Sequence, residues 1–455
     1  MESFLEFLTN LEDHLWSFVG FPIIIFLGVY FTFQSRFVQF LKFPLMLKIF
    51  FALLLGKKDS KTGIHPISAF FACVGGCVGI GNIVAICTAV QIGGPGALFW
   101  VWMTALVGMM LKYAEVYLGL KYRVRNNNGS YNGGPFFYLR KVCKTMFLPN
   151  IVCVLLCIYG VEIYQFNIMT QSIVNNFDMN PYLVIGVLLF LVMFAGSGGV
   201  RRVANISSTI IPLFIVIYIG MGIWVLALNI ETLPGVLKQV FISAFTGHAA
   251  VGGFAGSTIL MAISQGIRRG CYSSDVGVGY ASVIHSESSV RKPERQASLV
   301  FCDVFLDIFV ICTTSVLLIL VTGVWQEPIH ESLLIQTALG QYFPYMQYFM
   351  PLFLFLLGYS TIIAYFVVGI KCAEQLSPKY GRYAYYGYAL SSLLMFSFVD
   401  SRQAIAVMAV TQMLLLGINA YAFFKLRKEI NYNFDAPTAQ ESEQPASVVS
   451  LNANN

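Results

Sequence analysis

Charged side chains are scarce in this chain: Asp, Glu, Lys and Arg together make up 11% of its 455 residues. Ordinary soluble domains carry roughly 25%. Hydrophobic residues account for 57% of the chain, and the mean hydropathy is +0.72. This composition excludes a soluble globular protein. Long apolar segments recur from residue 15 to residue 424, which indicates an all-α polytopic membrane protein and not a β-barrel of short alternating strands.

Two further features are absent from the sequence. The first residues, MESFLEFLTNLEDH, are acidic and lack a basic n-region, so we expect no cleavable signal peptide. No GxxxxGK[ST] phosphate-binding loop occurs, which argues against direct use of ATP. The net charge of +6 is modest, and the basic residues lie in short loops between apolar segments. We therefore expect membrane lipid, and no nucleic acid, among the partners.

The ten cysteines do not form the pattern of a disulfide scaffold, because most lie inside apolar segments. Two C-x3-C pairs, Cys73 with Cys77 and Cys153 with Cys157, place sulfur atoms on one helical face where a metal could bind. No His or acidic residue accompanies them in the sequence. We therefore expect free thiols that pack as small apolar residues, and no cofactor other than a coupling ion.

Apolar runs bounded by Gly, Pro or charged residues predict eleven membrane spans. They cover approximately 15–34, 66–91, 96–122, 150–175, 181–198, 205–228, 246–265, 297–322, 346–373, 382–398 and 402–424. The segment 37–56 is apolar but holds Lys42, Pro44 and Lys48, so we expect an interfacial amphipathic helix there. The polar tail from about residue 430 is predicted to be disordered.

The distribution of Lys and Arg predicts the orientation in the membrane. If the N-terminus is outside and the loops alternate, 26 of the 28 basic residues fall on the inner side, including the segment from Arg268 to Arg295. Only Lys238 and Arg402 fall outside. We therefore expect a multi-pass protein of a bacterial-type plasma membrane, with its C-terminus in the cytoplasm.

The second predicted span is weakened at its centre. Its sequence FFACVGGCVGIGNIVAICTAV, residues 70–90, carries four glycines followed by Asn82. A glycine inside a helix costs about 1 kcal/mol relative to alanine. Once the first span is set aside, ten helices remain as two groups of five, and the second group must be inverted relative to the first. We expect five divisions: an extra N-terminal membrane helix at 1–35, an interfacial amphipathic segment at 36–62, the first five-helix repeat at 63–228, the inverted second repeat at 229–425, and a disordered cytoplasmic tail at 426–455.

The first helix of the second group, TGHAAVGGFAGSTILMAISQG at residues 246–266, is also glycine-rich at mid-span. Interrupted helices at matched positions in two halves are typical of a transporter binding site, because unwound backbone can bind substrate and ions. The alternative is close helix packing through small residues. The matched positions favour the binding site.

At these residues the chain resembles the alanine or glycine:cation symporter family, which has the inverted-repeat fold of the leucine transporter. The matching strings include GIGNIVAICTAVQIGGPGALFWVW (79–102), KYAEVYLGLKYR (112–123), GGPFFYL (133–139), HAAVGGFAGSTILMAI (248–263) and FLDIFVICTTSVLLILVTG (305–323). The resemblance implies two discontinuous helices, one extra N-terminal helix, and no enzymatic activity.

The resemblance also implies the site residues. For Na⁺ it implies backbone carbonyls of Gly75, Cys77 and Val78, the side chain of Asn82, and the hydroxyls of Ser360 and Thr361. For the substrate it implies Gly79, Gly81, Gln165, Asn167, Gly252, Gly253, Phe254 and Tyr365, although the family usually has Trp at the last position. The chain further departs from the family pattern at SSDVG (273–277), His248 and Arg402.

Several ionisable residues fall inside predicted spans, where a charge is a candidate functional group. Glu162 lies near the middle of the fourth span, about one turn from Gln165, and either titrates during transport or packs as a neutral or paired carboxylate. Lys112 and Glu115 have the spacing of an intrahelical ion pair. Asp307, which matches the family, is a candidate gating residue together with Asp303.

The sequence therefore predicts a secondary active transporter that moves a small neutral amino acid, such as alanine or glycine, inward with Na⁺. Two alternatives stay open: a proton-coupled amino-acid carrier that uses Glu162, and a membrane-embedded nutrient sensor that binds without transport. The sequence specifies neither the amino acid nor the oligomeric state.

Overall fold

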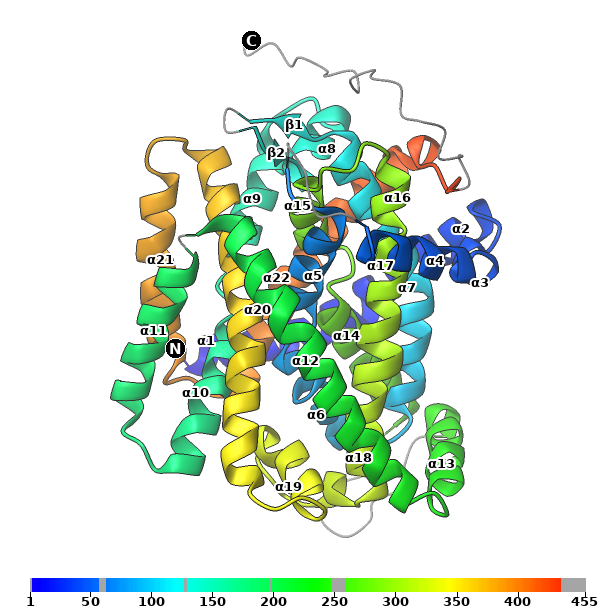
Figure 1. The fold of residues 1–455 in the computed structure, drawn as a ribbon, viewed down its shortest axis with the longest axis vertical. Coiled ribbons are helices and arrows are strands. Elements are labelled where there is room, and N and C mark those ends of the chain that lie inside the picture. Colours follow the sequence, from blue (N-terminus) through cyan, green and yellow to red (C-terminus); the bar gives the residue numbers. More distant parts are fainter. Residues whose placement is uncertain (1, 57–62, 127–128, 197, 247–257, 435–455) are drawn as a thin grey trace.

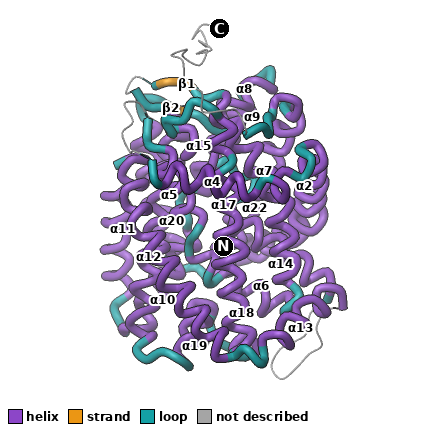
Figure 2. The backbone as a smooth tube through the Cα atoms, turned by 45° about the vertical axis from the view of Figure 1, so that its right-hand side comes forward, coloured by secondary structure: helices purple, strands orange, loops and turns teal. Residues whose placement is uncertain are grey.

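The structure is a computed structural model that describes residues 2–56, 63–126, 129–196, 198–246 and 258–434 (Figure 1). Helices make up most of this part of the chain, and loops connect them (Figure 2). The strands β1 (Val124–Arg125) and β2 (Tyr131–Asn132) form one short antiparallel pair at one end of the molecule. We call this the hairpin end. The prediction of an all-α fold is confirmed.

Seven helical segments of the described chain are long and apolar enough to cross a membrane, and the bent pair α5–α6 makes an eighth. The seven are Leu11–Gln34, Ala97–Lys121, Phe147–Phe177, Gly199–Leu228, Pro293–Val321, Met346–Leu376 and Ser401–Lys425. Three further helices of 16 residues each occupy or adjoin the remaining predicted spans: α11 (Pro181–Gly196), α14 (Ile259–Ser274) and α21 (Gly381–Phe396). Ten of the eleven predicted spans thus coincide with helices, and the seventh is shifted toward the C-terminus.

The first half of the chain supplies the following elements: α1 (Glu2–Leu15), η1 (Trp16–Gly20), α2 (Phe21–Gln34), α3 (Val38–Leu41), α4 (Phe43–Leu54), α5 (Pro66–Cys77), η2 (Ile80–Asn82), α6 (Ala85–Gly93), α7 (Ala97–Lys121), α8 (Pro135–Val142), α9 (Phe147–Tyr159), α10 (Ile163–Phe177), α11 and α12 (Gly199–Leu228). The short helices α3 and α4 occupy the segment predicted to be interfacial.

The second half supplies α13 (Leu233–Thr246), α14, α15 (Tyr280–Ser286), α16 (Pro293–Ala297), α17 (Leu299–Val304), η3 (Phe305–Cys312), α18 (Thr313–Val321), η4 (Val324–Gln326), η5 (Glu331–Leu333), α19 (Leu334–Gly340), α20 (Met346–Leu376), α21, α22 (Ser401–Lys425) and η6 (Arg427–Glu429). The elements η1 and η3 are π-helical, and η2, η4, η5 and η6 are 3₁₀ turns.

Burial separates the central helices from those at the periphery. Helix α20 is mostly apolar and is buried along most of its length, whereas α11 and α12 expose large apolar side chains such as Phe190, Val216 and Ile223. Helices that are hydrophobic all round belong in a large core or in a membrane. We therefore place α20 at the centre of the bundle and the outer faces of α11 and α12 against lipid.

The N-terminal helices pack onto the second half of the chain. The Trp16 indole Nε1 donates a hydrogen bond to the carbonyl of Ala409 at 3.0 Å. Arg268 on α14 forms ion pairs with Glu12 at 3.1 Å and with Asp13 at 2.5 Å. Arg268 is therefore buried within a helix against α1, and the prediction that it belongs to an inner loop is wrong.

The segment after α22 is docked on α7 and is not disordered up to Phe434. Tyr432 stacks on Tyr113 with ring centroids 5.3 Å apart, and Phe434 is buried. Lys121 forms an ion pair with Glu429 at 2.7 Å. Partial burial raises the pKa of the Glu429 carboxyl, but hydrogen bonds from Lys121 and Tyr122 outweigh it and lower that pKa below its usual value. The predicted disorder is thus wrong for residues 430–434; residues 435–455 lie outside the described part.

Candidate functional site

The first predicted interruption is present in the structure. Helix α5 ends at Cys77, where Val78 adopts an extended conformation, and the chain continues through η2 into α6. The axes before and after the break differ by 58°. Proline at the start of α5 and glycine at 79 fit these positions, because proline suits a first helical turn and glycine lacks a side chain. The prediction of a discontinuous helix at this position is confirmed.

Side chains bind the backbone groups that this break releases: Asn82 comes from the break itself, and Gln165 and Thr361 come from other helices. In a continuous helix the Gly79 and Ile80 amides would bond to the carbonyls of Gly75 and Gly76. Instead, the Gly79 N–H donates to Asn82 Oδ1 at 2.9 Å, and the Ile80 N–H donates to Gln165 Oε1 at 3.1 Å. The freed Gly75 carbonyl accepts a hydrogen bond from Thr361 Oγ1 at 3.1 Å. The break is therefore held open by polar contacts in the protein core.

A second interruption lies between α14 and α15, at residues 275–279. Asp275, Gly277 and Gly279 all have positive φ angles there, of 51°, 74° and 99°. Helix α14 packs along α6, and α15 packs along α5. In Figure 1, α5 and α15 lie toward the hairpin end, while α6 lies toward the opposite end. The two interrupted helices therefore run in opposite directions and meet at their breaks, as an inverted repeat requires.

The second break was predicted within 246–266, whereas the described structure shows an interruption at 275–279. Gly252, Gly253 and Phe254 lie outside the described residues. The described helix α14 continues eight residues past the predicted end of the segment, to Ser274. A short internal repeat marks the correct position: VGIG at 78–81 and VGVG at 276–279. This repeat is the sequence signal that could have located the second break.

Oxygen atoms from three helices converge beside the first break. Thr361 on α20 bonds to the Gly75 carbonyl, and Ser360 Oγ lies 2.9 Å from Ser207 Oγ on α12. A Cβ added to Gly75 would collide with Ser207 and lie 2.9 Å from Ser360 Oγ, so glycine is required for this approach. All these groups are neutral oxygens, the ligands that a hard alkali cation prefers. Ser207 was not predicted. We call these four residues the hydroxyl cluster.

Two other predicted Na⁺ ligands have different neighbours. Asn82 accepts from Gly79 and donates through Nδ2 to Asp307, and Nδ2 also lies 3.4 Å from Cys312 Sγ. Cys77 Sγ lies 3.2 Å from the ammonium of Lys112. The Asn82 side chain therefore stabilises the break itself, and the Cys77 side chain contacts the lysine of a neighbouring ion pair. Val78 is buried at the break, where its backbone is extended.

Glu162 occupies a third interruption that the sequence did not reveal. The fourth span is divided into α9 and α10, and Glu162 caps α10 with a left-handed φ of 51°. Its Oε2 accepts hydrogen bonds from Gln165 Nε2 at 3.1 Å and from Tyr272 Oη at 3.3 Å. The prediction that Glu162 lies within a continuous helix is wrong, but its proximity to Gln165 is confirmed. Gln165 thus connects Glu162 to the first break.

A set of tyrosine rings lines the region between the two breaks. Tyr365 stacks on Tyr280 with centroids 4.0 Å apart and meets Tyr159 edge-on at 5.4 Å. Tyr159 Oη donates to Asp275 Oδ1 at 3.1 Å. Asp275 is buried, and we did not single it out from the sequence as a site residue. The sequence placed it in a loop, although its position follows directly from the second break.

The remaining predicted substrate residues divide into two groups. Gly79 faces the site, because a Cβ there would lie 2.5 Å from Gln165 Oε1 and 2.6 Å from Thr361 Oγ1. Gly81 faces the ring of Tyr272. Asn167, by contrast, donates to the carbonyls of Phe396 and Val399 and accepts from Gln171. Asn167 therefore ties α10 to the end of α21, and its hydrogen bonds do not reach either break.

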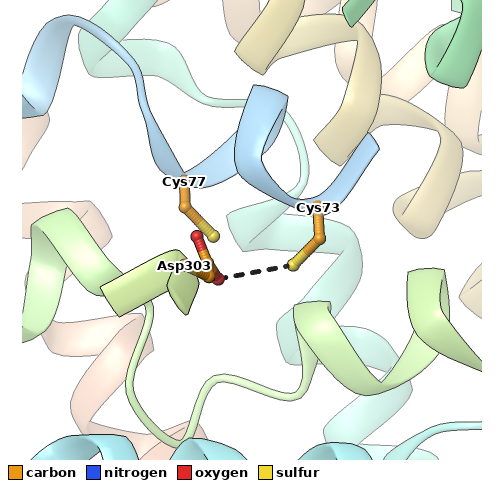
Figure 3. Close-up of side chains that lie close together, drawn as sticks. All are labelled: Cys73, Cys77 and Asp303. Carbon is orange, nitrogen blue, oxygen red and sulfur yellow. Dashed lines mark hydrogen bonds between the residues drawn. The ribbon is translucent and has the colours of Figure 1, made fainter. Parts of the chain in front are cut away.

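A charged cluster lies on another side of α5. Lys112 on α7 and Asp303 on α17 form a fully buried ion pair of 2.8 Å. Cys73, Cys77 and Asp303 place three possible metal ligands within 4.8 Å of one another (Figure 3). An acid does join the cysteines, contrary to expectation, but the Lys112 ammonium supplies the positive charge there.

Lys112 does not pair with Glu115, whose carboxylate accepts the Ser282 N–H at 3.1 Å. All cysteines of the described chain are free, as predicted.

Among the described residues, this arrangement offers groups that can bind ions and a polar solute. It provides the neutral hydroxyl cluster, an acidic side chain at Glu162, and backbone amides at a helix break. Unwound carbonyls can coordinate Na⁺, and half-helix ends can face a carboxylate. These are the properties of a solute-binding site at the junction of two broken helices.

Comparison with a solved structure supports this architecture. The manganese transporter of Eremococcus coleocola, in complex with an aromatic bis-isothiourea substituted compound, matches with a TM-score of 0.52 at 15% sequence identity. The match covers 79% of this chain and 80% of that chain. At this identity the likeness shows the fold alone. It is the inverted-repeat fold expected from the resemblance to the leucine transporter.

Sequence comparisons show the family. An uncharacterized transporter of Haemophilus influenzae is 35% identical over 70% of this chain and 71% of its own length. The sodium/alanine symporter AgcS of Methanococcus maripaludis is 29% identical over 82% of this chain and 84% of its length. The probable sodium/glutamine symporter GlnT of Bacillus subtilis is 29% identical over 94% and 90%. A family model described as the sodium:alanine symporter family matches residues 1–449. The chain therefore belongs to the sodium:alanine symporter family.

Proposed function

We propose that this protein carries a small neutral amino acid into the cell together with Na⁺. The observation that carries this proposal is the hydroxyl cluster, in which a backbone carbonyl freed by a helix break accepts a hydrogen bond from Thr361, while the hydroxyls of Ser360 and Ser207 lie beside Gly75. Its members come from α5, α12 and α20, so an ion bound there would join elements that are distant in sequence. Alternating access in this fold moves one group of helices against another around such a site.

The central contacts support an amino acid as the transported solute. Glu162 offers a carboxylate for a substrate ammonium group, and the Gly79 and Ile80 amides at the break offer donors for a substrate carboxylate. Gln165 now bonds to both Glu162 and the Ile80 amide, so it occupies the space between the two groups. The close approach of Gln165 and Thr361 to Gly79 leaves little volume there, which favours a small side chain.

The membrane potential can supply the driving force. Each charge that moves down a potential of 100 mV contributes about 2.3 kcal/mol. One or two Na⁺ per cycle can therefore support accumulation without ATP. We further propose that the hairpin end faces the cytoplasm, because Arg123, Arg140 and Lys141 cluster there, and cytoplasmic loops are enriched in such residues.

Proton coupling is the second candidate function, and Glu162 is the observation that favours it. This buried carboxylate accepts hydrogen bonds only from neutral groups and forms no ion pair within the described residues. Buried ionisable groups in membrane helices commonly relay protons. A carrier that used Glu162 in this way would depend on a proton gradient.

Uptake into proteoliposomes distinguishes these functions. Labelled L-alanine, L-glutamine and glycine are offered while an inward Na⁺ gradient or an inward proton gradient is imposed separately. We expect uptake of at least one of these to require Na⁺ and to be accompanied by Na⁺ entry. Uptake driven by protons alone would support the second candidate. Binding without uptake under either gradient would contradict both and support a sensor.

A further inference from the structure

A cavity separate from the central site lies near the end of the molecule that carries α19. Its volume is ≈ 570 Å³, within the 300–1,000 Å³ typical of small-molecule sites. Its walls come from α6, α14, the segment 325–331 and the first turn of α22. The segment 325–331 includes η4 residues and the start of η5, and both turns contact α19. We call this space the outer cavity.

Arg269 on α14 is a buried cation that lines the outer cavity. Arg269 has a relative exposure of 5%, and its Nε and Nη1 atoms have no hydrogen-bond partner among the described residues. The preceding Arg268, by comparison, is paired with Glu12 and Asp13. A buried charge without a partner is costly, so natural proteins seldom keep one without a use. The guanidinium of Arg269 is therefore available to bind an anion, and guanidinium suits carboxylate in particular.

Glu331 lines the same cavity and carries the opposite charge. Its Oε1 is buried and has no hydrogen-bond partner in the described part of the chain. No ion pair within 4.0 Å joins it to Arg269 among these residues, although each influences the other electrostatically. Other charged residues, Glu327, Asp400 and Arg402, also line the cavity, but Arg269 and Glu331 are the two whose buried charged atoms have no hydrogen-bond partner among the described residues. A zwitterion placed between them would satisfy both groups at once.

The outer cavity adjoins the route to the central site. Tyr272 follows Arg269 by three residues, about one turn of α14. Its hydroxyl bonds to Glu162, and its ring packs edge-on against Tyr164 with centroids 6.1 Å apart. Arg269 on the cavity wall and Tyr272 beside Glu162 therefore lie about one turn apart on the same helix.

We propose that the outer cavity is a second binding site for the amino acid, where Arg269 binds its carboxylate and Glu331 its ammonium group. The solute occupies this site before it passes to the central site. This proposal depends on the proposed function in one respect, because it assumes that the ligand is a free amino acid. It predicts that a molecule must carry both charges to bind there, so ethylamine and N-acetylalanine should bind poorly.

Protection of an introduced cysteine from a thiol reagent tests this site directly. Gln91 on α6 is partly exposed in the cavity, and Gln91→Cys provides a target for a membrane-impermeant methanethiosulfonate. The same protein without this substitution controls for the native thiols. L-alanine at saturating concentration should slow labelling of Cys at 91 by threefold or more, whereas ethylamine should not.

Two further variants separate the outer site from the central one. Alanine should still protect the introduced cysteine when Gln165→Ala disables the central contacts. In the Arg269→Gln variant, the same degree of protection should require about tenfold more alanine. That factor is the size expected for loss of one charge-assisted hydrogen bond. Arg269→Lys should restore part of the affinity. Absence of protection in the Gln165→Ala background, or full protection in Arg269→Gln, would overturn the proposal.

Uptake measurements distinguish failure of this proposal from failure of the proposed function. In proteoliposomes, Arg269→Gln should raise the KM for alanine about tenfold with a smaller effect on the maximal rate. Lys238→Gln removes an equal charge from exposed α13, outside the cavity, and should leave KM unchanged. Na⁺-driven uptake that is insensitive to Arg269→Gln would refute the outer site alone. Protection without any uptake would refute the transport function alone.

Discussion

Two environments around the end of α5 differ in how they accommodate positive charge. On one side, the Gly75 carbonyl meets Thr361, with Ser360 and Ser207 beside it, and every group is a neutral oxygen. On another side, Asp303 and Cys77 hold the ammonium of Lys112. A tethered ammonium occupies its place permanently, whereas neutral oxygens can exchange one cation for another. The comparison suggests which side of α5 binds a transported ion and which side maintains the fold.

The largest effect is expected from Lys112→Met, which would leave the Asp303 carboxylate buried without its cation. Breaking a buried ion pair by removing one partner typically costs about 3–5 kcal/mol. Thermal unfolding in detergent should therefore show a strongly lowered melting temperature. The double variant Lys112→Met/Asp303→Leu should recover much of the loss, because the Asp303 carboxylate is removed together with its cation.

Lys121→Met provides the matched control for this experiment. Lys121 lies on the same helix and also forms an ion pair, but its side chain and that of Glu429 are 32% and 42% exposed. Exposed pairs contribute about 0–1 kcal/mol. Equal melting temperatures for the Lys112 and Lys121 single variants would show that the buried pair does not maintain the fold, and the comparison would fail.

The next largest effect is expected from Thr361→Val, which removes the hydroxyl that meets the Gly75 carbonyl. We expect the Na⁺ concentration for half-maximal uptake to rise about 10- to 100-fold, with little change in melting temperature, because a lost ligand to a charged group costs about 1.5–3 kcal/mol. Thr411→Val is the control, since Thr411 is also buried and bonds only to the Val407 carbonyl in its own helix. An unchanged Na⁺ requirement in Thr361→Val would exclude the hydroxyl cluster as the ion site.

Ser207→Ala sharpens the same comparison with a smaller change. Ser207 contacts Ser360 and approaches Gly75, but it does not bond to the freed carbonyl. We expect the Na⁺ requirement to rise by about threefold to tenfold, since a neutral hydrogen bond contributes about 0.5–1.5 kcal/mol. Substrate KM measured at saturating Na⁺ should stay close to that of the unmodified protein. A change in substrate KM without a change in Na⁺ dependence would assign Ser207 to the solute instead.

The smallest effect on the Na⁺ requirement is expected from Glu162→Gln, because Glu162 lies outside the hydroxyl cluster. Glu162 differs from Asp303 because it faces neutral donors and no protein cation within the described residues. If this carboxylate exchanges a proton during the cycle, the glutamine variant should lose the pH dependence of uptake between pH 5 and pH 9. If it only binds the substrate ammonium, the variant should raise substrate KM and keep the pH profile. The two outcomes separate the second candidate function from the first.

Much of the fold follows from local sequence. Length and hydropathy located ten of the eleven spans, because a membrane helix needs a continuous apolar run. The break at Gly79 was also predictable, since glycines and Asn82 at the centre of such a run contradict helix propensity. The proximity of Gln165 to Glu162 followed from their spacing of three residues. Each of these features is encoded within one segment.

The errors arose where distant segments meet. The interruption at 275–279 was missed because Arg268, Arg269 and Asp275 made its helix resemble a polar loop, although the fold buries all three. Arg268 pairs with Glu12 and Asp13, and Asp275 accepts a hydrogen bond from Tyr159, and these partners are more than 100 residues away. Spacing alone paired Lys112 with Glu115, whereas its partner Asp303 comes from another helix.

The docked C-terminal segment has a practical consequence for handling the protein. Residues up to Phe434 cover the ring of Tyr113 and bind Lys121 on α7, a helix that also holds the buried ammonium of Lys112. An affinity tag or fluorescent fusion should therefore be joined after Phe434. Shortening the chain to the end of α22 would strip an aromatic cover from a central helix, and such a truncated protein should aggregate more readily on extraction from the membrane.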